Sequence, residues 1–131
     1  TTEAGWTIVL ANFLPLRMNE REGYFMRKMS YMITKEKTNV LEWIREAKER
    51  SGLPQATGRR QVQFTFQKTN QGQLDDPGNL WSRTKAPLDA MVKCGLLIDD
   101  NDQWLELPRP IQSKGPQKAT IIHLMDLEVV A

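Results

Sequence analysis

Hydrophobic and polar positions alternate strictly between Arg60 and Gln67. The positions that would share one side are Val62, Phe64 and Phe66, and those on the other side are Gln61, Gln63, Thr65 and Gln67. This period of two is that of a half-exposed β-strand. An apolar run from Trp6 to Leu10, ended by Pro15, predicts an earlier strand that is buried.

Two segments carry apolar residues at the three- and four-residue spacing of a helix. The first is expected to start at Thr34, a good helix cap, and to end at Gly52. Its apolar positions are Val40, Leu41, Ile44 and Ala47. The second carries Leu88, Met91 and Val92. It ends at Gly95, and because Pro87 would disturb a helix interior, it either kinks there or begins near Thr84.

The remaining segments complete a mixed fold. Residues 16–33 show no clear period, which predicts loop or irregular strand, whereas 104–107 alternate as a short strand. A loop over 108–118 and a last long strand over 119–130 follow. This order of elements predicts an α/β or α+β fold, a small mixed β-sheet with two helices packed on it. No repeat or linker divides the chain, so residues 1–131 are expected to form a single domain.

Composition narrows the class of protein. The chain is 40% hydrophobic and 26% charged, which is ordinary for a globular protein. No apolar run approaches the roughly 18 residues of a membrane helix, and the first residues lack the features of a secretory signal. The single cysteine, Cys94, cannot form an internal disulfide, and one Cys with one His cannot make a structural zinc site. We therefore expect a cytoplasmic protein with no membrane segment.

Charge is unevenly distributed along the chain. The net charge of +2 permits nucleic-acid binding without arguing for it. Basic residues crowd the first third, whereas acidic residues gather at 75–76 and 99–102. This pattern is typical of acidic pockets within a basic surface, although scattered solvated charges would produce it too. The candidates for DNA phosphate contacts are Arg17, Arg27, Lys28, Arg59 and Arg60.

Two acidic pairs flank the second predicted helix, Asp75–Asp76 before it and Asp99–Asp100 after it. If the fold brings the pairs together, a hard cation such as Mg²⁺ would relieve their mutual repulsion. A cation held in this way can activate water for attack on a phosphate. Lys85, in the same helix, would add a positive charge near the phosphate or the leaving group.

Each acidic pair also has a structural interpretation. Asp76 before Pro77 is a favourable start for a helix, with the aspartate as cap and the proline at the first position. The run Asp99-Asp100-Asn101-Asp102 can be a solvated turn. Spacing alone leaves both interpretations open.

The segment as a whole narrows this choice. It runs Asp75-Asp76-Pro-Gly78-Asn79-Leu80, then Lys85 and Asp89, then Gly95-Leu-Leu-Ile-Asp99-Asp100. This run resembles the signature of the RusA-like Holliday-junction resolvases. That family has an acidic stretch running into Asn-Leu, a helical Lys-x-x-x-Asp, and a Gly-hydrophobic run that ends in Asp-Asp. The resemblance is close over residues 74–104 and looser over the preceding elements.

The resemblance implies a homodimer that binds four-way DNA junctions and uses Mg²⁺, or Mn²⁺, to make paired nicks. Two symmetric cuts require two copies of one site around a two-fold axis. It further implies that Asp76 and Asp100 bind the metal, that Asp99 is an auxiliary acid and that Lys85 is the essential cation. Asn79 and Asp89 would orient the loop and the helix. Such proteins often come from bacteriophages or prophages, which fits the cytoplasm of a bacterial host.

The sequence departs from the family pattern at Gly78, where the family usually has an aspartate. Asp75 could compensate through a shifted loop and would then complete a metal set with Asp76, Asp99 and Asp100. Without compensation, cleavage would be lost while DNA binding need not be. Three hypotheses follow, namely a junction endonuclease, a non-cleaving DNA-binding dimer with a degenerate site, and a protein-interaction module whose acidic residues are turns and caps.

Overall fold

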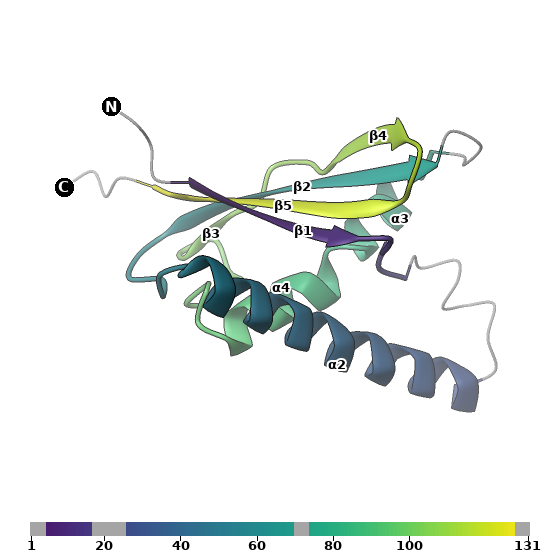
Figure 1. Ribbon diagram of the computed structural model, residues 1–131, viewed down its shortest axis with the longest axis horizontal. Coiled ribbons are helices and arrows are strands. Elements are labelled where there is room, and N and C mark those ends of the chain that lie inside the picture. The colour runs from purple at the N-terminus through teal and green to yellow at the C-terminus, as the bar shows by residue number, and fades with distance from the viewer. Residues whose placement is uncertain (1–4, 17–25, 70–73, 128–131) are drawn as a thin grey trace.

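A five-stranded mixed β-sheet carries helices on one of its faces in the computed structural model of the chain (Figure 1). The structure describes residues 5–16, 26–69 and 74–127, with side chains of the first helix described from Tyr31 onward. In chain order the elements are β1 (Gly5–Ala11), α2 (Met26–Ser51), β2 (Arg60–Thr69), α3 (Pro77–Ser82), α4 (Lys85–Lys93), β3 (Leu105–Glu106), β4 (Ile111–Gly115) and β5 (Ala119–Asp126). The predicted fold class, a mixed sheet with packed helices, is confirmed.

The strands are ordered β1-β5-β2, and the far edge of β2 pairs first with β3 and then with β4. β5 is antiparallel to both of its neighbours, whereas β3 and β4 are parallel to β2. β3 pairs with the start of β2, at Arg60 and Gln61, and β4 pairs with its end, from Thr65 to Thr69. The two ends of β2 therefore have different neighbours. The candidate site residues are divided between these two ends.

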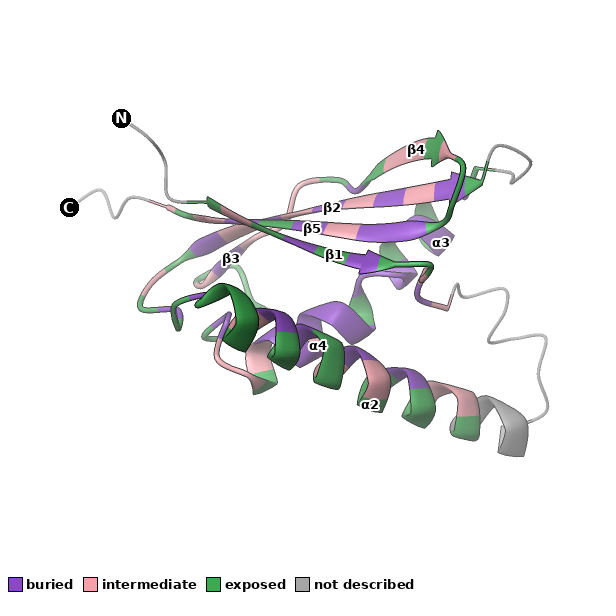
Figure 2. Ribbon diagram, in the orientation of Figure 1, coloured by how far each residue is buried: buried purple, intermediate pink, exposed green. Residues whose placement is uncertain are grey.

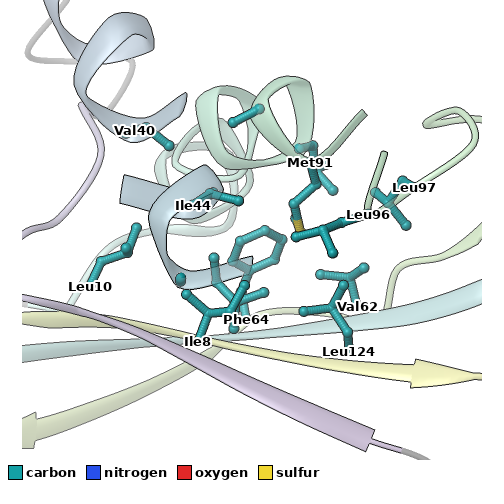
Figure 3. Packing of buried hydrophobic residues seen from close by; sticks show 14 of the residues in the cluster. Ile8, Leu10, Val40, Ile44, Val62, Phe64, Met91, Leu96, Leu97 and Leu124 are labelled. Carbon is teal, nitrogen blue, oxygen red and sulfur yellow. The ribbon is translucent and has the colours of Figure 1, made fainter. Parts of the chain in front are cut away.

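The hydrophobic core lies between one face of the sheet and helices α2 and α4 (Figures 2 and 3). β2 contributes the three residues that the alternation predicts, and the Phe64 and Phe66 rings stack with centroids 5.6 Å apart. Other fully buried members of this layer are Val40, Ile44, Met91, Ile122 and Leu124. Each large apolar side chain that is fully buried stabilises the fold by about 1.5–3 kcal/mol, so this layer is the main source of stability.

Helix α2 begins at Met26, well before the predicted start at Thr34. The predicted loop or irregular strand over 16–33 is therefore wrong for residues 26–33, which are helical. Methionine, arginine and lysine favour helix, and the buried face continues toward the N-terminus from Val40 through Glu36. Because a charged residue occupies that buried position, the spacing of apolar residues alone could not reveal the extension.

Both helical segments end at a glycine in the left-handed region, as predicted. Gly52 has a φ of 63°, and the N–H of Leu53 donates to the Lys48 carbonyl at 2.9 Å, which caps the end of α2. Gly95, with a φ of 86°, follows α4 in the same role. The chain can reverse direction at these two points without the steric cost that a side chain would bring.

The second predicted helix is divided in two by a turn at Arg83 and Thr84. α4 begins directly after Thr84, which is one of the two outcomes that Pro87 suggested. The proline occupies the third position of α4, where a backbone N–H has no partner within the helix. Its missing donor therefore costs nothing at this point.

Two strand predictions need correction. β1 is an edge strand in which only Ile8 and Leu10 are buried while Val9 is 57% exposed, so it is not a buried strand. A short apolar run does not show whether one face or both are covered. The predicted loop over 108–118 contains β4, whose largely polar sequence concealed it. β5 lies within the predicted last strand.

Candidate active site

Asp75 lies at the centre of a buried cluster of charged groups. Its side chain has an exposed fraction of 0%, Oδ1 accepts a hydrogen bond from Lys68 Nζ at 3.1 Å, and Oδ2 accepts one from Arg83 Nε at 2.7 Å. Gln112 holds its backbone from β4, accepting from the N–H at 2.7 Å and donating to the carbonyl at 3.0 Å. Two cations already neutralise this carboxylate, so Asp75 is not placed to bind a metal or to replace the acid missing at Gly78. The prediction of Asp75 as a ligand is corrected accordingly.

Arg83 ties this cluster to the chain that follows β1. Its Nη1 donates to the carbonyl of Pro15, and the next backbone N–H, that of Leu16, donates to Glu36 Oε2 at 2.9 Å. Arg83, Lys68 and Glu36 are all buried although each is a charged residue type. Burying a charge costs several kcal/mol unless it is paired, so these contacts hold β2, α2 and the α3–α4 turn in one arrangement.

Lys68, Arg83 and Glu36 were not among the predicted site residues. A signal existed for Lys68, which follows Phe66 at the spacing of two that puts it on the buried face. A weaker signal existed for Glu36, which precedes Val40 by one helical turn. Nothing in the local sequence marks Arg83, because its partner is determined by how the α3–α4 turn folds back.

Asp76, the next residue, caps helix α3. Its Oδ1 accepts from the Asn79 backbone N–H at 2.9 Å, its Oδ2 accepts from Asn79 Nδ2 at 3.3 Å, and Pro77 is the first helical residue. The interpretation of Asp76 as a helix cap is therefore confirmed. Unlike Asp75, however, Asp76 is exposed. A carboxylate has about four acceptor sites, so capping leaves it able to bind a ligand from solvent.

Gly78 is exposed and lies within the first turn of α3. Of the described atoms, a Cβ at this position would come near only Asp76 Oδ1, at 3.7 Å, which is an ordinary van der Waals distance. An aspartate would therefore fit here, with its carboxylate beside that of Asp76. Gly78 therefore differs from the family's usual aspartate by the missing carboxylate, and not because a larger side chain would clash.

Lys85 and Asp89 lie one turn apart on α4. Lys85 is the first residue of the helix and is exposed, whereas Asp89 is half-buried. Because Arg83 contacts Asp75, the start of α4 lies at the same end of the sheet as Asp76. An exposed carboxylate, an exposed ammonium and a rigid buried support thus occur together at the C-terminal end of β2.

The second acidic cluster lies at the other end of β2. Arg59 Nε donates to the Asp102 carbonyl at 3.1 Å, which holds the 99–102 turn beside the start of the strand. Asp75 binds Lys68, near the end of the same strand. At about 3.3 Å per residue along β2, the two clusters are about 25 Å apart within one protomer.

The predicted set of four carboxylates is therefore not assembled in one protomer. A shared site would require the two loops that flank the second predicted helix to lie side by side. Instead, α4 runs back along β2, so the loop before it and the loop after it lie at opposite ends of the sheet (Figure 1). Within residues 5–16, 26–69 and 74–127, no group of three or more Asp, Glu, His or Cys side chains lies close enough to hold a metal ion. Asp76 and Asp100 of the same protomer cannot share one.

The Asp99–Asp100 pair forms an exposed turn. Asp99 Oδ1 accepts from the Asp100 backbone N–H at 2.8 Å, and Oδ2 accepts from Asn101 Nδ2 at 3.3 Å. The interpretation of this run as a solvated turn is confirmed for Asp99. The Asp100 carboxylate is exposed, with no link to the first cluster.

Arg59 and Arg60 are adjacent but have different surroundings. Arg60 is 1% exposed, its Nε donates to Asp126 Oδ1 at 2.7 Å, and its guanidinium lies 4.9 Å from the centre of the Trp6 ring. It cannot reach a DNA phosphate in this arrangement, so that prediction is corrected. Arg59 is exposed and keeps donors beyond the one bound to Asp102, so it is accessible to a phosphate.

The other candidates for phosphate contacts are Arg17, Arg27 and Lys28. Arg17 lies outside the described residues. Arg27 and Lys28 lie in the first turn of α2, and their side chains are outside the described part of the chain. Exposed lysines do follow in the same helix, at Lys35 and Lys37.

Comparison with known proteins adds no family assignment. The chain matches no protein-family model, and a search of curated proteins finds no match. The resemblance to the RusA-like resolvases therefore rests on the sequence run over 74–104. Among the helices that the structure describes, none is both long and apolar enough to cross a membrane.

Proposed function

We propose that this chain is a Mg²⁺-dependent endodeoxyribonuclease that resolves four-way DNA junctions as a homodimer, with its active end at Asp76 and Lys85. The observation that supports this is the resolvase-like run from Asp75 to Asp100, in which the acid and the cation at the start are both exposed at one end of the sheet. A phosphodiester can reach such groups without any change in the fold.

The chemistry of this end suits Mg²⁺. The ion is usually bound through one or two carboxylates, with water and substrate phosphates completing its coordination. Asp76 would be the protein ligand, because its remaining acceptor sites face solvent. When bound, Mg²⁺ or Mn²⁺ supplies an activated water and stabilises charge on the phosphate. Asp100 is too distant to complete this set within one protomer, about 25 Å away.

The surrounding residues would position this carboxylate and bind the substrate. Asn79 contacts both oxygens of Asp76 and so fixes its orientation. Asp75, held by Lys68 and Arg83, anchors the backbone directly before it. Lys85 would contact a phosphate oxygen and stabilise the charge that develops as the bond breaks.

A non-cleaving junction-binding dimer is the second candidate, and one observation favours it. With Gly78 lacking a carboxylate and Asp75 engaged in ion pairs, Asp76 is the sole exposed carboxylate among residues 74–79. A site with one acid fewer binds Mg²⁺ more weakly, whereas phosphate contacts from basic residues such as Arg59 would be unaffected.

Incubation of the protein with a synthetic four-way junction, with and without Mg²⁺, tests the proposal. Paired nicks that need Mg²⁺ and do not occur on linear duplex are the expected result. Lys85→Gln should lower the rate about tenfold or more, while Lys93→Gln, at the far end of the same helix, should leave it unchanged. Tight junction binding without nicks would support the second candidate, and absence of salt-sensitive binding would leave only a protein-interaction module.

A further inference from the structure

Trp81, in the last turn of helix α3, is an aromatic residue that is 38% exposed. Trp43 is almost equally exposed, at 39%, but its ring packs edge-on against Phe13, with centroids 5.1 Å apart. Within the part of the chain that the structure describes, no aromatic ring packs against Trp81 in this way. Tryptophan is mostly buried in folded proteins, so an exposed ring without such a partner needs a physical reason.

Trp81 lies on the same exposed side of α3 as the candidate metal ligand. Pro77, the first residue of α3, is exposed and precedes Trp81 by four positions, which is about one helical turn. Asp76 caps the helix directly before Pro77 and is exposed too. At a rise of about 1.5 Å per residue, the backbones of Asp76 and Trp81 are about 8 Å apart along the helix axis. This is about two steps of 3.4 Å along a DNA strand.

Lys85 follows Trp81 by one further turn. Arg83 and Thr84, which separate α3 from α4, keep right-handed helical backbone angles, with φ values of −68° and −81°. Four residues along such a backbone make about one turn, so Lys85 and Trp81 occupy neighbouring positions on one side. The N–H and the hydroxyl of Thr84 both donate to the Trp81 carbonyl, at 3.0 and 2.7 Å, and hold this geometry.

A second exposed lysine lies at this end of the sheet. Lys114 of β4 is exposed and pairs with Lys68 of β2, the residue that binds Asp75. Gln112, two positions earlier, contacts the Asp75 backbone, and side chains two apart in a strand point to the same face. Exposed lysines near an exposed aromatic ring are typical of a surface that binds nucleic acid, whereas the centre of a protein–protein interface is depleted of charge.

We propose that Trp81 stacks on an unpaired base next to the phosphate that is cut, an inference that rests on the proposed function. Inside a linear duplex both faces of each base are covered by its neighbours, so the ring has no free face to bind. At a branch point a base can leave the stack at a lower cost and expose a face. Stacking on that base would bring the adjacent phosphate to Asp76 and Lys85. Cleavage would then depend on branching, and other DNA with unpaired bases would be bound as well.

Binding to DNA without Mg²⁺, measured by fluorescence anisotropy, tests this separately from cleavage. The probes are a linear duplex with one unpaired thymine and the fully paired duplex of the same length. Wild type is expected to bind the unpaired probe at least about fivefold more tightly. Trp81→Leu, which is apolar but has no ring, should lose this preference, whereas Trp81→Phe should keep most of it. Trp43→Leu is the matched control, because Trp43 is equally exposed, and should bind as wild type does.

Tryptophan fluorescence gives a second measurement, which remains decisive should Trp81→Leu fail to fold. A base stacked on the ring should quench its emission, so the unpaired probe should quench wild type and Trp43→Phe more than Trp81→Phe. Equal quenching of wild type and Trp81→Phe would overturn the proposal.

Wild type that binds both probes equally would also overturn the proposal, as would a preference that survives in Trp81→Leu. The second of these results would leave the exposed ring to a protein partner. Because binding is measured without cleavage, a preference that needs the ring in a protein that does not nick junctions would overturn only the nuclease. Paired nicks made by Trp81→Leu at the wild-type rate would overturn only the role of Trp81.

Discussion

Arg83 Nε donates to Asp75 Oδ2 at 2.7 Å, although the two residues lie on either side of helix α3. This contact gives neighbouring aspartates opposite surroundings. Asp75 is enclosed by cations and supports the fold, whereas Asp76 caps α3 and is exposed to solvent. The acidic pair that the sequence presents as one unit therefore divides into a structural residue and a candidate ligand.

Asp75→Asn should lower the free energy of unfolding by about 3–5 kcal/mol, because it leaves the buried charges of Lys68 and Arg83 without this carboxylate. Urea denaturation measures this directly. Asp76→Asn is the matched control and should change stability by less than about 0.5 kcal/mol, since asparagine caps a helix as well as aspartate does. Were Asp75 a metal ligand repelled by its neighbours, its replacement would leave the metal-free protein as stable or make it more so.

Arg60→Ala should destabilise the protein by about 1–3 kcal/mol, because the buried guanidinium donates to the carbonyls of Leu96 and Pro54, which would lose this donor. Arg59→Ala should leave the denaturation curve nearly unchanged and weaken junction binding, with the salt dependence of log Kd reduced by about one. Denaturation and salt-dependent fluorescence anisotropy separate these effects. The reverse assignment, a stable Arg60→Ala variant that binds DNA poorly, would show that the buried position of Arg60 is wrong.

Gly78→Asp should raise the rate of junction cleavage about tenfold or more at limiting Mg²⁺, because it adds a second carboxylate beside Asp76. The fold should accept it, since an acid in the first turn of a helix stabilises by about 0.3–1 kcal/mol. Gly78→Asn has nearly the same shape without the charge and should not raise the rate. Equal rates for Gly78→Asp and wild type would mean that the metal is not bound at this end.

The fold was largely predictable because its hydrophobic pattern is regular. The alternation in β2 and the terminal glycines of α2 and α4 place those elements nearly where they occur. Prediction from this pattern fails where charged residues occupy buried positions. Arg60 and Lys68 continue the buried face of β2. Charged residues are normally expected at the surface, so the sequence pattern suggests a DNA contact for Arg60 and gives no role to Lys68.

The candidate site was less predictable, because it depends on distance in space. The run over 74–104 supplies the candidate residues, but whether Asp76 and Asp100 meet within one protomer depends on the direction of α4 relative to β2. No local pattern encodes that direction. The ion pairs of Asp75 could not be predicted from local sequence for the same reason, since Lys68 and Arg83 come from separate elements.

Cleavage of a four-way junction by Asp76→Asn and by Asp100→Asn, measured side by side in Mg²⁺, tests whether Asp76 alone of the two holds the catalytic metal. Asp102→Asn, in the same exposed turn as Asp100, is the control for loss of surface charge. We expect Asp76→Asn to lower the rate roughly 100-fold or more, while Asp100→Asn and Asp102→Asn cleave within about threefold of wild type. Equal loss in Asp76→Asn and Asp100→Asn would contradict it, because Asp100, about 25 Å from Asp76 within one protomer, would then belong to the catalytic site.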